Sequence, residues 1–214
     1  MKKVFCTIST HSHLYKCFAL AESIVAYGGV LEILIVDQME QDIVSPANVI
    51  FTFLESLNSE LEQGIIQKYK HKTDCLRWSL KSVFLLHLLE KEEKVIYVDN
   101  DILFFSNPGF LFDELDQHKV LLTPHHYPRN PEINQNWFEA NFRVGLYNAG
   151  FFAANKAAKD VLVWWAKACL YRCEKNYWRG LFDDQKYLDL VPIIESKTKI
   201  VDHLGCNVAE WNKE

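Results

Sequence analysis

The chain has 214 residues, 49% of them hydrophobic and 24% charged, which is the composition of one folded domain with a core of its own. Its formal net charge of −5 argues against nucleic acid as a partner, because phosphate backbones select basic surfaces. The six cysteines form no C-x-x-C pair, so we expect free thiols. We see no signal peptide and no transmembrane segment and expect a cytoplasmic protein, with peripheral contact at the inner membrane face left open.

The first third of the chain alternates between strand and helix patterns. Residues 4–8 form a short apolar strand, residues 14–26 have apolar positions at helical spacing, and residues 31–36 form a second strand. This β-α-β order favours parallel pairing with a right-handed crossover. Residues 49–53 are a candidate third strand, whereas residues 55–72 show no clear pattern.

A strong helix pattern covers residues 73–89, with apolar side chains around most of its circumference. Arg77 and Lys81 lie one turn apart on it and therefore share a face. Buried cations need an anion, so we expect one or both to meet a diphosphate, a sugar hydroxyl or the carboxylate of Asp99. The alternative is that their aliphatic stems carry the charges out to water.

Two carboxylates follow the next predicted strand, residues 95–98. Asp99 and Asp101 are separated by one residue, and in an extended chain such positions project to the same side. Their oxygens suit Mg²⁺ or Mn²⁺. Because residues 102–105 are again apolar, we expect the two carboxylates to lie within a buried pair of strands, where they need a partner or a metal. The alternative is a solvated acidic turn.

The second half of the chain predicts an α/β fold whose sheet becomes antiparallel or mixed late in the sequence. The stretch 124–144, rich in proline, is expected to be a long functional loop. The expected strands are residues 120–122, 147–154 and 199–202, and the expected helices are residues 155–170 and 183–190.

Two short polar segments complete the candidate chemistry. Asn148, Ala149 and Gly150 lie in a predicted strand, where small residues let a ligand approach the backbone closely; a bulge or a tight packing contact is the alternative. Asp184 and Gln185 lie at the start of the short helix 183–190 and can face a pocket, while Asp183 is a candidate N-cap.

Three motifs in this order and spacing resemble nucleotide-sugar glycosyltransferases of the GT-A fold, in particular the family 8-like branch and its bacterial polysaccharide relatives. They are VIYVDND (95–101), GLYNAGF (145–151) and FDDQ (182–185), and GCNVAEWN (205–212) resembles a segment of the bacterial relatives. The resemblance implies one GT-A domain over residues 1–214, a Rossmann-like mixed sheet flanked by helices. The nucleotide-binding part would cover about 1–105, and the donor-sugar and acceptor part about 106–214.

The resemblance also implies an activity, the transfer of a hexose from a nucleotide-diphosphate sugar to a glycan, lipid-linked or protein acceptor, with retention of configuration. Asp99 and Asp101 match the D-x-D motif that holds Mn²⁺ or Mg²⁺ on the donor diphosphate. Donor contacts are implied for Lys81, Asn148, Ala149 and Gly150, a place at the reaction centre for Asp184 and Gln185, and nucleotide contacts for Thr7, Ser9, Thr10 and Asp37. Aromatic faces suit sugar rings, so His125, His126 and Trp137 form a candidate acceptor wall.

Two departures from this family keep alternatives open: the late histidine, and Lys186, which follows Gln185 where the family often has a further acidic residue. Family 8 enzymes carry a late histidine on the metal; here His203 stands in a different setting, so we expect a third ligand elsewhere or an incomplete C-terminal region. A haloacid dehalogenase-like phosphatase would use Asp99 as nucleophile with Thr123 and the paired acids Asp183 and Asp184, although that motif normally opens its domain. A GT-A-like scaffold that binds without turnover is the other alternative.

Overall fold

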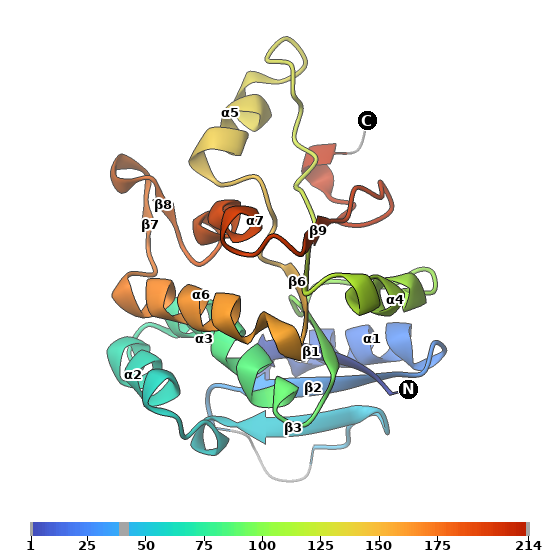
Figure 1. Cartoon of the computed structure of the whole chain (residues 1–214). Coiled ribbons are helices and arrows are strands. Elements are labelled where there is room, and N and C mark those ends of the chain that lie inside the picture. Colours follow the sequence, from blue (N-terminus) through green and yellow to red (C-terminus); the bar gives the residue numbers. More distant parts are fainter. Residues whose placement is uncertain (1, 39–42, 213–214) are drawn as a thin grey trace.

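The computed structural model describes residues 2–38 and 43–212, and within them a seven-stranded sheet is flanked by helices (Figure 1). The strand order is β3-β2-β1-β4-β6-β5-β9. The strands are β1 Lys3–Ser9, β2 Gly29–Ile35, β3 Val49–Phe53, β4 Lys94–Val98, β5 Val120–Leu122, β6 Phe151–Asn155 and β9 Thr198–Ile200. Strands β1 to β4 pair in parallel, whereas β6 runs antiparallel to β4 and β5. The predicted α/β fold with a mixed late part is confirmed.

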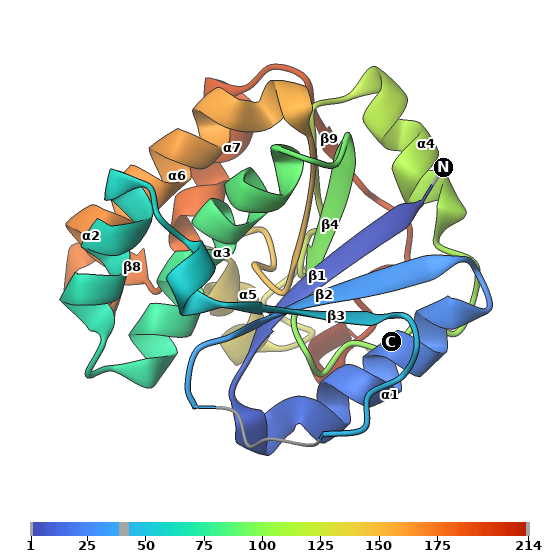
Figure 2. The ribbon, with the colours of Figure 1, turned by 90° about the horizontal axis from the view of Figure 1, so that it is seen from below.

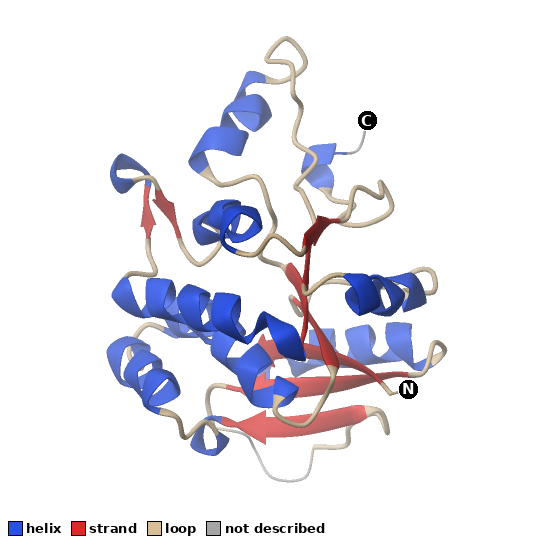
Figure 3. Ribbon diagram, in the orientation of Figure 1, coloured by secondary structure: helices blue, strands red, loops and turns tan. Residues whose placement is uncertain are grey.

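Helices cover both faces of this sheet (Figures 2 and 3). On one face lie α2 (Glu60–Tyr69), α3 (Thr73–Leu89) and α6 (Lys159–Tyr171), and on the other lie α1 (Leu14–Val25) and α4 (Gly109–Gln117). Strand β1 feeds both cores, because Val4, Cys6 and Ile8 face α3 while Phe5 faces α1. The shorter elements are α5 Gln135–Arg143, α7 Val191–Ile194 and the hairpin of β7 Lys175–Asn176 and β8 Leu181–Phe182.

Two segments for which the sequence predicts no helix are partly helical. Within residues 55–72, α2 begins at a capping box in which Ser59 accepts the backbone N–H of Glu62 and the Glu62 carboxylate accepts that of Ser59. The predicted loop 124–144 contains α5, capped by Asn134, whose side chain accepts the N–H of Trp137 at 3.1 Å. Both helices start from side-chain caps that satisfy free backbone donors.

Three other boundaries differ from the prediction. Residues 102–105 form no strand and expose Leu103 and Phe105, so the expected buried pair of strands is wrong. The strand predicted over residues 147–154 begins only at Phe151, because residues 148–150 form a turn that Asn148 closes on the N–H of Gly150. The predicted helix 183–190 is a 3-10 helix that starts at Lys186.

The antiparallel direction of β6 brings its first residues to the carboxyl ends of the parallel strands. Val98, the last residue of β4, pairs with Phe151, the first residue of β6. One residue further along, the N–H of Asp99 donates to the carbonyl oxygen of Gly150 at 2.9 Å. The D-x-D segment and the Asn148–Gly150 turn therefore meet at the sheet edge where α/β proteins bind ligands.

Candidate functional site

The ammonium group of Lys81 is the centre of a buried polar cluster. Its nitrogen lies 3.3 Å from Asp99 Oδ1 and 3.4 Å from Asp184 Oδ2, and it donates to the carbonyl oxygen of Ala149 at 3.0 Å. It also lies 5.2 Å from the ring centre of Tyr97. Only 4% of the Lys81 side chain is exposed. One cation from α3 thus joins the end of β4, the turn before β6 and the segment after β8.

The cluster contains one ammonium group and two carboxylates, and Asp99 is more exposed than Lys81 and Asp184. Burial alone would lower the pKa of Lys81, but the carboxylates of Asp184 and Asp99 outweigh it, so the amine stays charged. Burial raises the pKa of the Asp184 carboxyl well above its usual range, with Lys81 opposing the shift. Oδ2 of Asp184 is buried and accepts no hydrogen bond. Burial, together with the negative charges of Asp183 and Asp99 nearby, therefore gives Asp184 an increased affinity for a proton.

Asp99 and Asp101 occupy different environments. Asp99 Oδ1 accepts the phenol hydrogen of Tyr97 at 2.8 Å as well as facing Lys81, while the side chain is partly exposed. Asp101 is exposed on the following turn and lines a cavity. The expectation that both carboxylates are buried is wrong, because the chain turns outward after β4: Asp101 is exposed, and 41% of the Asp99 side chain is exposed. Between them, Asn100 donates to Ser9 Oγ at 3.2 Å and ties the motif to β1.

The donor set around Asp99 and Asp101 fits a metal only in part. Across residues 2–38 and 43–212, no three His, Cys, Asp or Glu side chains gather around a common point. His203 lines the same cavity as Asp101, but its Nδ1 accepts the N–H of Gly205 at 3.0 Å, which leaves the proton on Nε2 in the neutral ring. Mg²⁺ in proteins is often held by one or two carboxylates together with substrate phosphates and water. The residues present fit a cation shared with a diphosphate.

The Asn148–Gly150 turn is held from two sides. Asn148 Oδ1 accepts the N–H of Gly150 at 2.8 Å, and its Nδ2 donates to Asn207 Oδ1 at 2.6 Å. Gln185 Oε1 accepts the N–H of Ala149 at 3.1 Å. At Gly150 an added Cβ would lie 3.0 Å from Asp99 Oδ2, so only glycine leaves that oxygen its present space. The small residues here permit close packing around Asp99.

The structure adds two residues that sequence reasoning missed. Tyr97 donates to Asp99, and the alternation within VIYVDND already places it on the same side of the strand as Asp99. Asn207 links Asn148 to the carbonyl oxygen of Pro124, to which it donates at 2.8 Å. The available signal for Asn207 was its place in the GCNVAEWN segment.

Of the four residues expected to contact the nucleotide, Thr7 and Ser9 belong to β1, and Thr10 and Asp37 follow the ends of β1 and β2. Thr7 is fully buried inside β1, whereas Ser9 donates to the carbonyl oxygen of Thr10 at 3.0 Å. Asp37 Oδ1 accepts the N–H of His11 at 2.8 Å. Ser9 therefore reaches the D-x-D segment through Asn100, and Thr10 and Asp37 organise the loop beside it.

Arg77 is not part of the Lys81 cluster. Its guanidinium pairs with Asp74 on the same helix, with 2.6 Å between Nη2 and Oδ1. The carboxylate is exposed, so this pair lies near the surface of α3. Of the two cations predicted from the α3 sequence, the structure brings only Lys81 to the carboxylates.

The predicted acceptor wall is an aromatic cluster. The ring of His125 stacks on Tyr127 at 4.5 Å between centroids, and Trp137 stacks on Tyr127 at 5.5 Å. His125 is only 3% exposed, so its ring supports the cluster from inside. Trp137 and His126, together with Trp211, line a cavity of about 340 Å³.

In sequence, the chain is similar to two curated bacterial proteins. No family model matches the chain. Two proteins of Bacillus subtilis (strain 168), the uncharacterized proteins YfnF and YfnD, are 27% and 28% identical to it; the alignments cover 99% and 98% of this chain and 73% and 69% of those proteins.

The fold is identified by the similarity of the chain to solved structures of other proteins. Mouse xyloside xylosyltransferase 1 in its apo form has a TM-score of 0.57 and 15% identity over 94% of this chain and 86% of its own. The galactosyltransferase LgtC in complex with donor and acceptor sugar analogs has a TM-score of 0.57 and 12% identity, over 92% of this chain and 72% of the LgtC chain. Core-mannan synthase A from Aspergillus fumigatus, in a Mn/GDP form, has a TM-score of 0.58 and 10% identity over 100% and 78%. The chain has the GT-A fold. In the described residues, no helix combines the length and the apolar character that a bilayer crossing requires.

Proposed function

We propose that this GT-A chain is a glycosyltransferase that moves a sugar from a nucleotide-diphosphate donor to an acceptor, related to the family 8-like enzymes and their bacterial polysaccharide relatives. The observation that carries the proposal is the Lys81 cluster, which joins Asp99, Ala149 and Asp184 at the carboxyl edge of the sheet. The resemblance in three motifs and the glycosyltransferases among the similar structures support it. They do not favour the phosphatase alternative.

The chemistry of glycosyl transfer sets the roles of the residues. Positive charge develops on the sugar and negative charge on the leaving diphosphate. Asp99 and Asp101 would hold Mn²⁺ or Mg²⁺, which when bound neutralises the leaving charge. Since Lys81 is buried, we assign it the positioning of Asp99 and of the Asn148–Gly150 turn. Thr10 and Asp37 would border the nucleotide, beside the segment that Ser9 anchors.

Asp184 and Gln185 are our candidates at the reaction centre, with retention of configuration as the expected outcome. Both are buried beneath the turn that Gln185 supports through Ala149. The raised pKa of Asp184 suits a group that takes a proton. Of the predicted acceptor wall, Trp137 and His126 border a cavity, whereas His125 is enclosed. We place the protein in the cytoplasm, where its six free cysteines would stay reduced.

A thermal-shift experiment tests the donor site. Uridine and guanosine diphosphate, each with and without Mn²⁺, are added to the wild type, to Asp101→Ala and to the control Asp113→Ala, an exposed carboxylate on α4. We expect one nucleotide to raise the melting temperature only with Mn²⁺, because a ligand of the native state stabilises it by mass action. Asp101→Ala should lose this shift, and the control should keep it.

Two other results would count against the proposal. Stabilisation by a nucleotide without Mn²⁺ would contradict the two-carboxylate metal site. No stabilisation by any nucleotide would contradict the donor site itself. Release of free nucleotide diphosphate from sugar nucleotides then separates an enzyme from a scaffold that binds without turnover, because only the enzyme releases it.

A further inference from the structure

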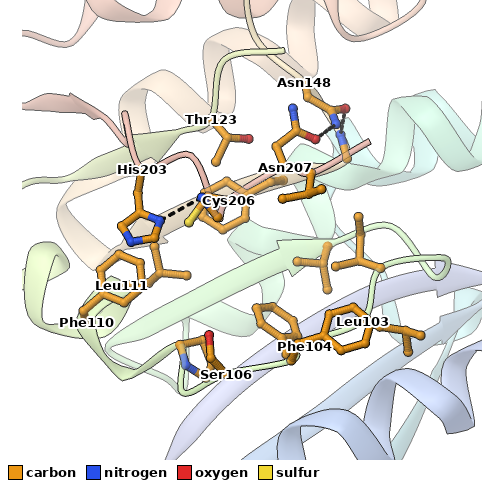
Figure 4. Close-up of a pocket in the computed structure, with 18 of the residues that line it drawn as sticks. Leu103, Phe104, Ser106, Phe110, Leu111, Thr123, Asn148, His203, Cys206 and Asn207 are labelled. Atoms are coloured by element: carbon orange, nitrogen blue, oxygen red, sulfur yellow. Dashed lines mark hydrogen bonds between the residues drawn. The ribbon is translucent and has the colours of Figure 1, made fainter. Parts of the chain in front are cut away.

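A cavity of about 350 Å³ begins at the proposed diphosphate site and extends away from it (Figure 4). At the end near that site it is lined by Asp101, Asn148 and Gly150. The other end lies between the 102–108 loop, the start of α4 and residues 203–208. The Lys81 cluster and the proposed nucleotide loops contribute no side chain to its lining, so it is space beyond the donor diphosphate.

The far end of this cavity is apolar and partly open to water. Phe104 and Phe110 line it, and Phe110 lies 5.7 Å from the ring of His203. Leu103 and Phe105, from the same outward turn that exposes Asp101, are 48% and 92% exposed. Exposed apolar side chains grouped at the mouth of a cavity indicate a surface that is covered when a ligand is present.

The near end carries polar groups, one of which lacks a partner. Thr123 is 1% exposed, lines the cavity, and its hydroxyl has no hydrogen-bond partner. Figure 4 places it beside Asn207, which is bonded to Asn148. A buried hydroxyl without a partner is costly, whereas a ligand hydroxyl at this end would satisfy it.

We propose that this cavity binds the acceptor, and that the acceptor is an amphiphilic glycoside, a sugar joined to an apolar aglycone. The inference rests on the proposed function and adds the class of acceptor to it. The sugar lies at the polar end, next to Asp101 and Asn148, where its hydroxyl meets the donor. The aglycone lies over Phe104 and Phe110 and covers the exposed Leu103 and Phe105. A free sugar would leave this apolar half in water.

The test uses a homologous set of ligands with the same sugar. Methyl, butyl and octyl β-glucosides and β-galactosides, all below their micellar concentrations, are titrated into the full chain with Mn²⁺ and the stabilising nucleotide, and binding is followed by ligand-observed NMR. We expect affinity to rise at least roughly tenfold from methyl to octyl, since each fully buried methylene is worth about fourfold.

Variants locate the effect. Phe110→Ser and, as a second variant at a fully exposed position, Phe105→Ser should each reduce the gain from methyl to octyl severalfold. Tyr171→Ser, which removes an exposed ring on α6, should leave it unchanged. Thr123→Val should weaken all the glycosides by a similar factor and leave the dependence on chain length intact.

Each outcome bears on one of the two proposals. This inference alone is refuted if the protein binds nucleotide but its affinity for the glycosides does not depend on the length of their alkyl group. It is also refuted if the affinity depends on that length but both phenylalanine variants leave the dependence unchanged. A dependence on chain length in a protein that binds no nucleotide refutes the proposed function, and the acceptor role with it.

Discussion

Lys81 shows how much of the site depends on one buried charge. Its ammonium group lies within 3.4 Å of Asp99 and Asp184 and donates to Ala149, so three segments far apart in sequence share one cation. Removing a single partner of a buried ion pair leaves the other charge uncompensated. Lys81 therefore affects both the stability of the protein and the geometry of the site.

Replacing Lys81 gives a measurable prediction. Lys81→Met should lower the free energy of unfolding by about 3–5 kcal/mol in urea denaturation, because Asp184 is left buried without its counter-charge. The double variant Lys81→Met/Asp184→Asn should recover part of that loss. Lys91→Met, at an exposed position, is the control. Equal losses in the single and double variants would show that Asp184 is not the group left uncompensated.

His125 predicts how stability depends on pH. Burial lowers the pKa of its imidazole to about 4, against about 6.5 in an unfolded chain. Between these two pKa values the unfolded chain binds more protons than the folded protein. The contribution of the neutral His125 to the free energy of unfolding is therefore complete above pH ~6.5 and is lost as the pH falls toward ~4. The loss is on the order of 3 kcal/mol. When urea unfolding is measured from pH 7 to 4.5, the free energy of unfolding of His125→Phe should depend less steeply on pH than that of the wild type. Equal slopes in the two proteins would show that His125 does not cause the loss of stability.

At the level of elements, the turn before β6 joins the core of the sheet to the proposed chemistry. A Cβ at Gly150 would lie 3.0 Å from both Asp99 Oδ2 and Asn148 Oδ1, so either the carboxylate or the amide must move. Gly150→Ala should therefore abolish the nucleotide- and Mn²⁺-dependent shift in melting temperature.

A second glycine provides the control for this substitution. At Gly64, inside α2, an added Cβ meets only Leu170, at 3.5 Å. Gly64→Ala should keep the nucleotide shift and stabilise the protein by about 0.5–1 kcal/mol, because alanine loses less backbone freedom in a helix. If Gly150→Ala also kept the shift, the close packing around Asp99 would not matter for binding.

The elements that sequence predicted well are those whose signal is local. The long apolar helix 73–89 and the strand before Asp99 needed only periodicity and length. The capping box of Ser59 and Glu62 was also present in the sequence and would have revealed α2. Residues 102–105 were misread because an apolar run does not show whether it packs in a core or lines a cavity.

The structure brings the motif segments together, while the binding and catalytic roles of their residues stay predictions. The N–H of Asp99 donates to Gly150, and Gln185 accepts the N–H of Ala149. Lys81 meets Asp99, which was one of the alternatives proposed. The contact between Asn148 and Asn207 joins residues 59 apart in sequence, and no local pattern predicts such a pair. The pairing of Arg77 with Asp74 was equally open to a local reading, since the two lie one helical turn apart.

For the whole molecule, we propose that residues 1–214 behave as one cooperative domain. The nucleotide-binding part and the donor-sugar and acceptor part share a single sheet, because β4 pairs with β6 over five residue pairs. Urea unfolding followed by tryptophan fluorescence and by far-UV circular dichroism should give coincident transitions. Two separated transitions would show that the parts unfold independently and would contradict the single domain.

The pairing of Val98 with Phe151 has a consequence for how this chain tolerates length changes. A residue inserted between Gly150 and Phe151 would have one of two effects. It would turn Phe151 and Phe152 to opposite faces, exchanging their places in the two cores, or, if β6 kept its register, it would pull the glycine away from Asp99. Insertions at the exposed residues 105–107 face no such constraint. Natural length variation should therefore accumulate around the cavity and be absent from the start of β6.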